Sequence, residues 1–353
     1  MGIKRGVSLY SYQQAQFFKQ LDLRGMLREM RDVLNCRGVE IIDEAMIRQY
    51  PFPSENFYTE WHDLIQEFGM IPVTIDVYLD TLQFRDHVMT HEEAAERVKR
   101  DLGIAKKMGF QNIRVLCSIP IDVIEMALPT AEELGVRIGK EIHAPFDIKT
   151  NTWDRYRVKG GFPRNPRMCE EIIELADRKS SKFVGLVPDM GIFQHAINEP
   201  QKQYMMRHGI RRDVIDLVEE IAQSGIRNPA WTREIVVDTL PDVSEKDLAV
   251  CRQVGMFSNV KGEDLTEIVP YIVSIHGKCY DLTEVPGLPG EYEDKAVDYP
   301  TAIAALKAGG FEGYINTEYE GQRNQQDRGM EYLADEIEQV RRHQKMLQRL
   351  IGE

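Results

Sequence analysis

Eight short apolar runs recur along the chain, and several of them begin at or just after a glycine. Many are nearly continuous in valine and isoleucine with little polar alternation. That pattern is typical of strands that are buried on both faces of a parallel sheet. The runs span residues 6–10, 38–43, 71–78, 112–119, 137–144, 183–189, 272–279 and 314–318.

Amphipathic helices separate most of these runs. Within 92–108, Ala95, Val98 and Leu102 recur at the helical period and form part of one apolar stripe. Similar patterns predict helices over 23–33, 56–68, 167–178, 301–308 and about 330–350. Eight strands that alternate with helices predict an α/β fold, a (β/α)8 TIM barrel.

Glycines support this alternation. Gly69, Gly109, Gly135 and the pair Gly309-Gly310 each follow a helical pattern shortly before the next strand. Glycine readily takes the left-handed conformation that ends a helix, so the same αβ turn is repeated along the chain. A G-x-G-x-x-G motif does not follow the first run, and G-x-x-x-x-G-K occurs nowhere, so a dinucleotide or P-loop site has little support.

The interval between the sixth and seventh strands, from Asp189 to His276, is much longer than its neighbours. It predicts an extended helical insertion over about 192–265, with helices near 211–222 and 244–254 joined by Asn228-Pro229-Ala230-Trp231. A second long loop, about 281–299, is rich in proline, glycine and acidic residues. Long loops on the catalytic face of a barrel usually form lids, substrate walls or partner contacts. We expect a single TIM-barrel domain over 1–353.

The composition and net charge argue against two classes of binding partner, nucleic acids and membranes. The net charge of −13 argues against a nucleic-acid partner, which requires a basic face. Apolar stretches long enough to cross a bilayer are missing from the sequence, and so is the core of a signal peptide. The five cysteines are widely spaced and odd in number, which fits reduced thiols better than a disulfide framework. These features predict a cytoplasmic protein that does not associate with membranes.

The most concentrated chemistry lies at the downstream ends of the last four barrel strands. Glu141, Asp189, His276 and Glu318 each end one of these strands, and in a TIM barrel such ends meet at the catalytic face. Three carboxylates and one imidazole suit a divalent metal, with Mn²⁺ favoured for a mostly oxygen site and Mg²⁺, Co²⁺ or Zn²⁺ possible. The alternative is that each residue is a solvated polar group at the start of a loop.

Further candidates share these strand ends. His143 is a candidate general base, because it lies two residues from Glu141 and imidazole titrates near neutral pH; alternatively it only bonds a neighbouring loop. Lys278 can stabilise a negative oxygen beside the metal or form a structural salt bridge. Weaker candidates for substrate contacts are Tyr10, Tyr12, Asp43, Asp76, His195 and Glu320. The arginine-rich stretch 154–168 is a candidate loop over an anionic or aromatic ligand.

With these residues in place, the chain resembles the xylose-isomerase-like barrel superfamily, which includes sugar-phosphate isomerases and epimerases and metal-dependent abasic-site endonucleases. The resemblance rests on the order Glu, Asp, His, Glu at strand ends 5 to 8 and covers about 5–321. It implies that Glu141, Asp189, His276 and Glu318 together bind one divalent ion.

Within that superfamily the chain most resembles the catalytic alpha subunit of bacterial C-glycoside deglycosidases. The matching segments are Glu141-Ile142-His143-Ala144-Pro145-Phe146, Asp189-Met190-Gly191 and His276-Gly277-Lys278, together with the long segment between strands 6 and 7. Such enzymes cleave the carbon–carbon bond between a sugar and a flavonoid-type aglycone, generally after oxidation of the sugar to its 3-oxo form. They act as hetero-oligomers with a small β-rich beta subunit. The resemblance implies a lyase in which His143 is the base.

Two other readings remain open. The sequence Asp189-Met190-Gly191-Ile192 lacks the histidine that often follows this glycine in ketose isomerases and epimerases, which weakens that reading without excluding it. In such an enzyme Glu141 and Glu318 would pass a proton to and from the carbon beside a carbonyl. A barrel that has kept its scaffold and binds a ligand without catalysis is the third reading. An endonuclease would require additional histidines and a basic face, which the sequence lacks.

Overall fold

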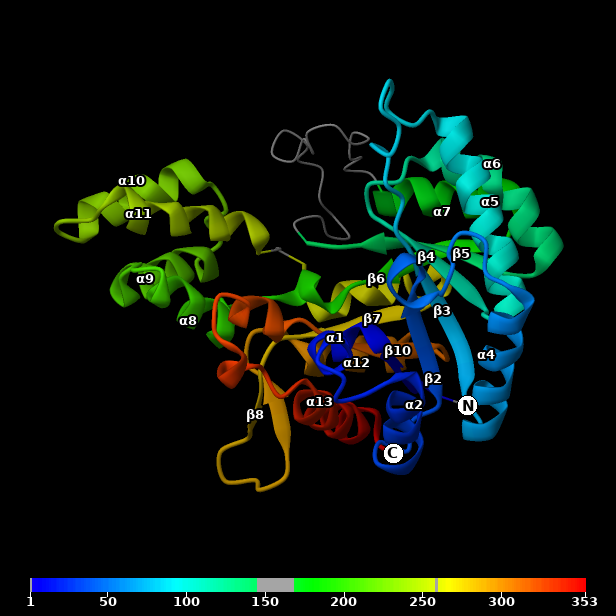
Figure 1. Ribbon diagram of the computed structural model, residues 1–353. Helices are drawn as coiled ribbons and strands as arrows, with labels where there is room; N and C mark the ends of the chain where they lie inside the picture. Colours follow the sequence, from blue (N-terminus) through cyan, green and yellow to red (C-terminus); the bar gives the residue numbers. More distant parts are fainter. Residues whose placement is uncertain (1, 145–167, 258–259) are drawn as a thin grey trace.

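The computed structural model describes residues 2–144, 168–257 and 260–353. Within these residues, eight parallel strands form a barrel that helices surround (Figure 1). The barrel strands are β1 (Lys4–Ser8), β2 (Gly38–Ile42), β3 (Ile71–Val77), β4 (Asn112–Val115), β5 (Arg137–Ile142), β6 (Val184–Pro188), β7 (Ile275–Cys279) and β10 (Tyr314–Tyr319).

The strands follow the order β6-β5-β4-β3-β2-β1-β10-β7, and the bridges Leu186–Ile272 and Asp189–His276 join the two outer members. The predicted TIM barrel is therefore confirmed. All eight strands lie where the apolar runs predicted them, with ends that differ by a few residues. The second bridge also sets Asp189 directly beside His276, two residues that are far apart in the sequence.

The outer helices bury their apolar stripes against the barrel and share one large hydrophobic core with it. They are α2 (Leu23–Asp32), α4 (Glu55–Phe68), α5 (His91–Met108), α6 (Ile121–Leu134), α7 (Met168–Lys179), α12 (Tyr299–Ala308) and α13 (Glu336–Ile351). Gly69, Gly109 and Gly135 follow α4, α5 and α6 with φ of 61°, 83° and 69°, as the glycine pattern predicted. The last helix is shorter than expected. Residues Met330–Tyr332 form a separate 3₁₀ turn (η7), and Asp335 caps α13 through the amide of Glu338.

Shorter elements lie at the ends of the first two strands. A 3₁₀ turn, η1 (Leu9–Tyr12), and helix α1 (Gln13–Phe17) follow β1, and helix α3 (Asp43–Met46) follows β2. These elements belong to the face of the barrel where the strands end, which is the catalytic face of this fold.

The predicted insertion between β6 and β7 is a helical lobe that extends to one side of the barrel (Figure 1). After the turn η2 (Met190–Phe193) it contains α8 (Glu199–Arg207), α9 (Arg212–Gln223), α10 (Pro229–Thr239), α11 (Glu245–Leu248) and η3 (Ala249–Met256). The lobe has its own apolar cluster, which includes Val214, Val218 and Val236. The turns η4 (Gly262–Glu267) and η5 (Val269–Tyr271) then lead back to β7.

The segment around Asn228 differs from the expectation of a joint between two helices. Asn228 accepts hydrogen bonds from the amides of Ala230 and Trp231, and Pro229 stands at the first position of α10. An asparagine cap followed by proline favours the start of a helix, since proline lacks the amide that would be unpaired there. The lobe therefore contains a helix, α10, between the two helical stretches that the sequence predicted.

The long loop at 281–299 also contains regular structure. Strands β8 (Leu282–Glu284) and β9 (Tyr292–Asp294) form an antiparallel ribbon, and the proline- and glycine-rich residues connect them. The arginine-rich stretch 154–167 lies outside the described residues. Among the helices of the described part of the chain, none is both long and apolar enough to cross a membrane. All five cysteines are described and buried, and no disulfide joins them.

Candidate metal centre

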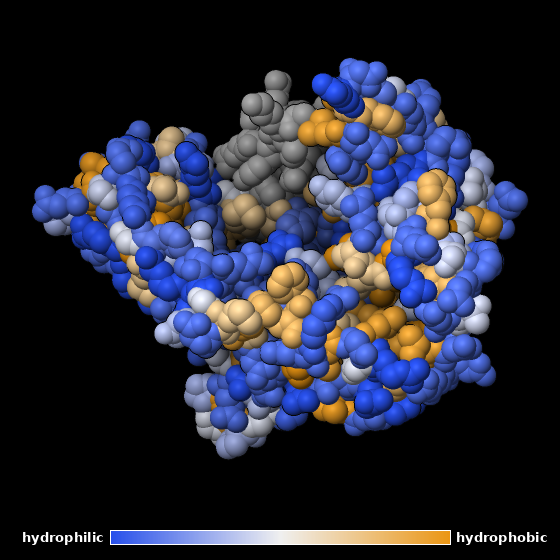
Figure 2. All heavy atoms as spheres, viewed as in Figure 1, coloured by the Kyte–Doolittle hydropathy of each residue, from blue (hydrophilic) through white to orange (hydrophobic). Residues whose placement is uncertain are grey.

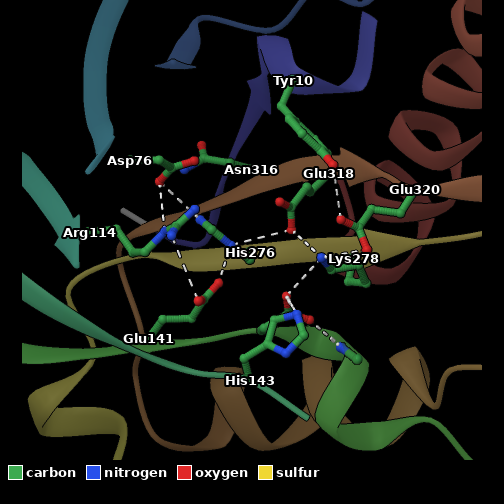
Figure 3. Close-up of polar contacts among 12 residues, drawn as sticks. Tyr10, Asp76, Arg114, Glu141, His143, His276, Lys278, Asn316, Glu318 and Glu320 are labelled. Carbon is green, nitrogen blue, oxygen red and sulfur yellow. Dashed lines mark hydrogen bonds and ion pairs between the residues drawn. The ribbon is translucent and has the colours of Figure 1, made fainter. Parts of the chain in front are cut away.

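His276 stands at the centre of a polar cluster inside the mouth of the barrel (Figure 3). Its side chain is 0% exposed, and both ring nitrogens face carboxylates. Nδ1 lies 3.1 Å from Glu141 Oε1 and 3.3 Å from Glu318 Oε2. Nε2 lies 3.3 Å from Asp76 Oδ1 and 3.4 Å from Glu40 Oε1. The imidazole therefore separates an inner pair of carboxylates from an outer pair.

Three predicted ligands converge on the inner side. One ligand atom each from Glu141, Asp189 and His276 lies within 4.8 Å of the others, the spacing that a single ion can bridge. Glu318 belongs to the same side, because its Oε2 faces His276 Nδ1. All four side chains are buried. Glu141 and Glu318 are the penultimate residues of β5 and β10, and Asp189 directly follows β6, as the sequence predicted. His276 is instead the second residue of β7, because this strand begins later than the apolar run did.

Three buried ligand atoms that meet there, Asp189 Oδ2, His276 Nδ1 and Glu318 Oε2, form no hydrogen bond of good geometry in the described part of the chain. The cation beside the two carboxylate oxygens is the ammonium of Lys278. When Nε2 carries the imidazole proton toward Asp76, the Nδ1 lone pair points at carboxylate oxygens, which is favourable only with a cation between them. Imidazole and carboxylates are ligands that divalent first-row metals accept. The residues present therefore fit a divalent cation.

Electrostatics agree with this fit. Burial opposes a charged imidazole, but Glu40, Glu318 and Asp76 outweigh burial and raise the pKa of His276 well above its ordinary value. Burial also opposes a charged Glu141, yet Arg114 and His276 hold its pKa below the usual range. A proton on His276 thus takes the place of the cation in the metal-free chain, and a bound metal would displace it.

Three residues of the outer side were not predicted: Glu40, Arg114 and Asn316. Arg114 Nε lies 3.1 Å from Asp76 Oδ1, and Asn316 Nδ2 donates to Glu40 Oε2 at 2.7 Å. Burial, reinforced by Asp76, raises the pKa of Glu40 to about 8. Each residue lies inside a buried strand, and a charged or amide side chain at such a position is a signal that could have identified it.

Lys278 bridges the acidic residues of β6 and β10 (Figure 3). Its Nζ lies 3.1 Å from Asp189 Oδ2, 2.8 Å from Glu318 Oε2 and 3.0 Å from Glu320 Oε2. Burial opposes its charge, but these three carboxylates raise the pKa of Lys278 well above its ordinary value. Lys278 is therefore a buried ammonium next to the candidate ligands, and both roles expected of it are compatible with this position.

His143 lies beside the ligands with one nitrogen already committed. Its Nδ1 is 2.6 Å from the carbonyl oxygen of Ala144, and a carbonyl can only accept, so Nδ1 carries the proton. Nε2 then holds a lone pair, and it lies 3.7 Å from Asp189 Oδ2. The side chain is 36% exposed, so a substrate can reach this nitrogen.

Tyr10, Asp76 and Glu320 also belong to the cluster, whereas Asp43 and His195 make other contacts. The Tyr10 hydroxyl donates to Glu320 Oε1 at 3.3 Å. Asp43 is buried and accepts from the amides of Glu44 and Tyr78, so its carboxylate braces the ends of β2 and β3. His195 is exposed, and its amide donates to Ala296 where the chain enters the lobe. Tyr12 is buried in the main core.

Comparison with known proteins defines the class of fold. No family model matches the chain. The fold is that of a xylose-isomerase-like TIM barrel, similar to a D-psicose 3-epimerase from Clostridium cellulolyticum H10 (TM-score 0.56, 12% identity, 99% of this chain and 100% of the other). It is also similar to the IolI protein with a bound zinc atom (TM-score 0.54, 13% identity, 99% and 98% covered).

Sequence similarity points to a narrower group. The chain is 26% identical over 334 residues to a C-glycoside deglycosidase alpha subunit of Arthrobacter globiformis, covering 90% of this chain and 84% of the relative. It is 23% identical over 360 residues to the 3'-dehydrocarminate deglycosidase alpha subunit of a Microbacterium species, covering 99% and 95%. The resemblance to deglycosidase alpha subunits that the sequence motifs indicated is confirmed.

Proposed function

We propose that this chain is the metal-dependent catalytic subunit of a C-glycoside deglycosidase, a carbon–carbon lyase that acts on aryl C-glucosides, in particular their 3-oxo forms. The observation that carries the proposal is the convergence of Glu141, Asp189 and His276 in a chain whose relatives are named C-glycoside deglycosidase alpha subunits. The buried ligand atoms that form no hydrogen bond of good geometry among the described residues support a divalent ion, and we propose Mn²⁺.

Glu141, Asp189, His276 and Glu318 would hold the ion, which when bound would supply Lewis-acid stabilisation of negative charge on sugar oxygens. His143 Nε2 accepts a proton, either from C2 of the sugar beside the 3-oxo group or from a phenol of the aglycone. The ammonium group of Lys278 stabilises the substrate oxygen that gains negative charge. Cleavage of the bond between the anomeric and aryl carbons, with a proton added to the aryl carbon, releases the aglycone.

The name "alpha subunit" of the relatives supports a second polypeptide. We propose that a small beta subunit joins the chain in a hetero-oligomer. Exposed apolar side chains in the segments that follow the barrel strands are compatible with such an interface; they include Phe17, Phe52, Leu82 and Met330. Figure 2 shows a hollow between the lobe and the barrel on this side of the molecule.

The test is chromatographic. The purified chain with Mn²⁺ is incubated with a 3-oxo aryl C-glucoside, with and without a co-expressed beta subunit, and free aglycone is measured. We expect release that depends on the partner, is lost in His143→Ala and persists in His62→Ala, where an exposed histidine of α4 is removed. Absence of aglycone under every condition would contradict the proposal.

A second candidate is a divalent-metal-dependent sugar isomerase or epimerase. It is favoured by the placement of Glu141 and Glu318 on either side of His276 Nδ1, at 3.1 Å and 3.3 Å, as a two-carboxylate proton transfer requires. Conversion of a free ketose without any partner, with loss of activity in Glu141→Gln and Glu318→Gln, would establish this candidate. A barrel without catalysis would bind its ligand equally well after Glu141→Gln and would hold no stoichiometric metal.

A further inference from the structure

Among the described residues, the mouth of the barrel contains more carboxylates than lysine and arginine side chains, and two of these three basic side chains are enclosed. Lys278 is 3% exposed and Arg114 is 9% exposed, and both lie against carboxylates of the candidate metal centre. Arg323, in the turn η6 (Gly321–Gln325) directly after β10, is 54% exposed. Among the described residues that contact this cluster, Arg323 is therefore the cation that a ligand can reach from solvent.

The guanidinium of Arg323 is held in place from one side. Nη2 lies 2.8 Å from Glu320 Oε1 and also donates to the Tyr10 hydroxyl, and the guanidinium carbon is 5.4 Å from the centre of the Tyr10 ring. These contacts use the two N–H groups of Nη2. The N–H groups of Nη1 and Nε have no hydrogen-bond partner in the described part of the chain, and arginine has no acceptor of its own.

Glu320 does not fully cancel this charge. Its second oxygen lies 3.0 Å from Lys278, so one carboxylate is shared by two cations. Lys278 in turn contacts Glu318, so three contacts, through Glu320 and Lys278, connect Arg323 to a candidate metal ligand (Figure 3 shows Tyr10, Glu320, Lys278 and Glu318 together). Arg323 therefore stands on the β10 side of the candidate metal centre, next to residues that contact its candidate ligands.

The turn that carries Arg323 is anchored to the lobe. Arg207 of α8 forms two contacts with Asp327, at 3.0 Å and 2.7 Å, and donates to the carbonyl oxygen of Asn324. A charged group that is fixed before the ligand arrives loses little conformational entropy on binding. Arg323 is therefore positioned in advance, by Glu320 and Tyr10 on one side and by the lobe on the other.

We propose that Arg323 is a specificity-determining residue that pairs with a carboxylate on the aromatic aglycone. This inference rests on the proposed function for the nature of the ligand. The free N–H groups at Nη1 and Nε are donors to an anionic oxygen, and charge-assisted hydrogen bonds of this kind are stronger than neutral ones. An ionised phenol offers the same chemistry with one oxygen instead of two, so the test includes it as a separate arm.

The experiment measures binding and requires no turnover, so it is informative even if carbon–carbon cleavage is never observed. The full chain loaded with Mn²⁺ is titrated calorimetrically with 4-hydroxybenzoate and with 4-hydroxybenzamide, which has nearly the same shape and no charge. A nitrophenol that is ionised at the working pH serves as the phenolate arm. The variants are Arg323→Gln, Arg323→Lys and, as a control, Arg233→Gln, which removes an exposed arginine of α10.

We expect the benzoate to bind about five- to tenfold more tightly than the amide, the range for one charge-assisted contact at a half-exposed position. Arg323→Gln should abolish the difference, Arg323→Lys should retain part of it, and Arg233→Gln should leave it unchanged. Equal affinities in the unmodified chain, a preference that survives Arg323→Gln, or no binding of either ligand at millimolar concentration would each overturn the inference. A preference for the phenolate over the benzoate would overturn the assignment to a carboxylate.

Discussion

His276 unites two functions in one side chain, because its two nitrogens face different partners. Nδ1 meets the inner acceptors, whereas Nε2 lies 3.3 Å from Asp76, which Arg114 holds from the other side. A carboxylate behind a ligating histidine fixes the tautomer and raises the basicity of the free nitrogen. Asp76 was predicted as a residue of a sugar pocket, and its contacts instead support a role behind the ligand.

Removal of this carboxylate should weaken metal binding without removing a ligand. We expect Asp76→Ala to lower the affinity for Mn²⁺ by about 10- to 100-fold and Asp76→Asn to have a smaller effect, because asparagine keeps an acceptor but loses the charge. Competition with a chelator measures the affinity. Asp86→Asn, at an exposed position in the loop after β3, is the control. An unchanged affinity in Asp76→Ala would assign the Nε2 contact a purely structural role.

Glu336 provides a pH-dependent contribution to stability. It is buried at the start of α13, where it accepts from the amides of Gln14 and Ala15, and burial raises its pKa from 4.5 to about 7. The folded chain therefore holds this proton more tightly than the unfolded chain does. Stability must fall as the pH rises from about 4.5 to about 7, since the unfolded state binds fewer protons in that window.

Glu336→Gln cannot ionise, so it should abolish this fall. Relative to the unmodified chain, we expect the variant to gain about 1–3 kcal/mol in free energy of unfolding between pH 5 and pH 8. Urea unfolding at the two pH values measures the difference, with the exposed Glu331→Gln as the control. A difference between variant and unmodified chain that is the same at both pH values would show that Glu336 does not titrate in this window.

Whether a residue of the site could be predicted from the sequence depended on its position in its strand. Glu141, Asp189, His276 and Glu318 were predicted because they stand at or near the ends of the apolar runs, and the ends of barrel strands converge in any TIM barrel. Glu40 and Arg114 lie within strands, where the apolar pattern hid their inward direction. The commitment of His143 Nδ1 to Ala144 and of Asp43 to two backbone amides depends on loop geometry, which sequence periodicity does not encode.

At the scale of elements, the seam between β6 and β7 is where the barrel closes. Within the described residues, isolated bridges at Leu186 and Asp189 join these strands, whereas the other neighbours form ladders of three or more residue pairs, with one register shift between β2 and β3. Gly185 permits the close approach, because a Cβ at this position would lie 2.3 Å from the carbonyl oxygen of Tyr271. Backbone cannot move away as a flexible side chain can, so the seam tolerates only glycine here.

Gly185→Ala should therefore destabilise the barrel by about 1–3 kcal/mol or more, the range for overpacking a well-packed interior. Gly103→Ala is a matched control within α5, where a Cβ meets nothing within 4 Å. The same substitution should stabilise the chain there by about 0.5–1 kcal/mol, since alanine favours a helix more than glycine does. The urea midpoint of Gly185→Ala should lie below that of the unmodified chain and the midpoint of Gly103→Ala above it. If both midpoints shift in the same direction, this account is contradicted.

Helices and strands were predicted correctly where one local sequence signal determined them. Strands β2 and β3 were predicted closely because their runs are rich in valine and isoleucine, and α5 because its apolar stripe ends at a glycine. The β8–β9 ribbon was missed because its strands are three residues each, too short for a periodic pattern. Helix α10 was missed because Asn228-Pro229 was interpreted as a break, although the same pair can begin a helix.

At the scale of the whole molecule, the lobe and the barrel have separate apolar clusters, yet contacts at both ends of the lobe connect them. Ile192 and Phe193 before the lobe and Val260 and Leu265 after it belong to the core of the barrel. Arg207 adds a contact between α8 and Asp327. Because the lobe connects β6 to β7, the barrel can close around His276 only when the two ends of the lobe lie close together.

These connections predict that the chain unfolds as one cooperative unit, consistent with our expectation of a single domain. Val218→Ala, in the core of the lobe, should lower the free energy of unfolding by about 2 kcal/mol. Mn²⁺ at about 100 times its dissociation constant should raise that free energy by about 2.7 kcal/mol.

Hydrogen exchange during urea unfolding reports the lobe and the barrel separately, through peptides from 199–256 and from the barrel strands. Both regions should share one midpoint, and each perturbation should shift both regions together. If Mn²⁺ moves the midpoint of the barrel and leaves that of the lobe in place, the lobe is an independent folding unit, and its tie to the metal centre through Arg207 and Asp327 is weaker than the stability of either core.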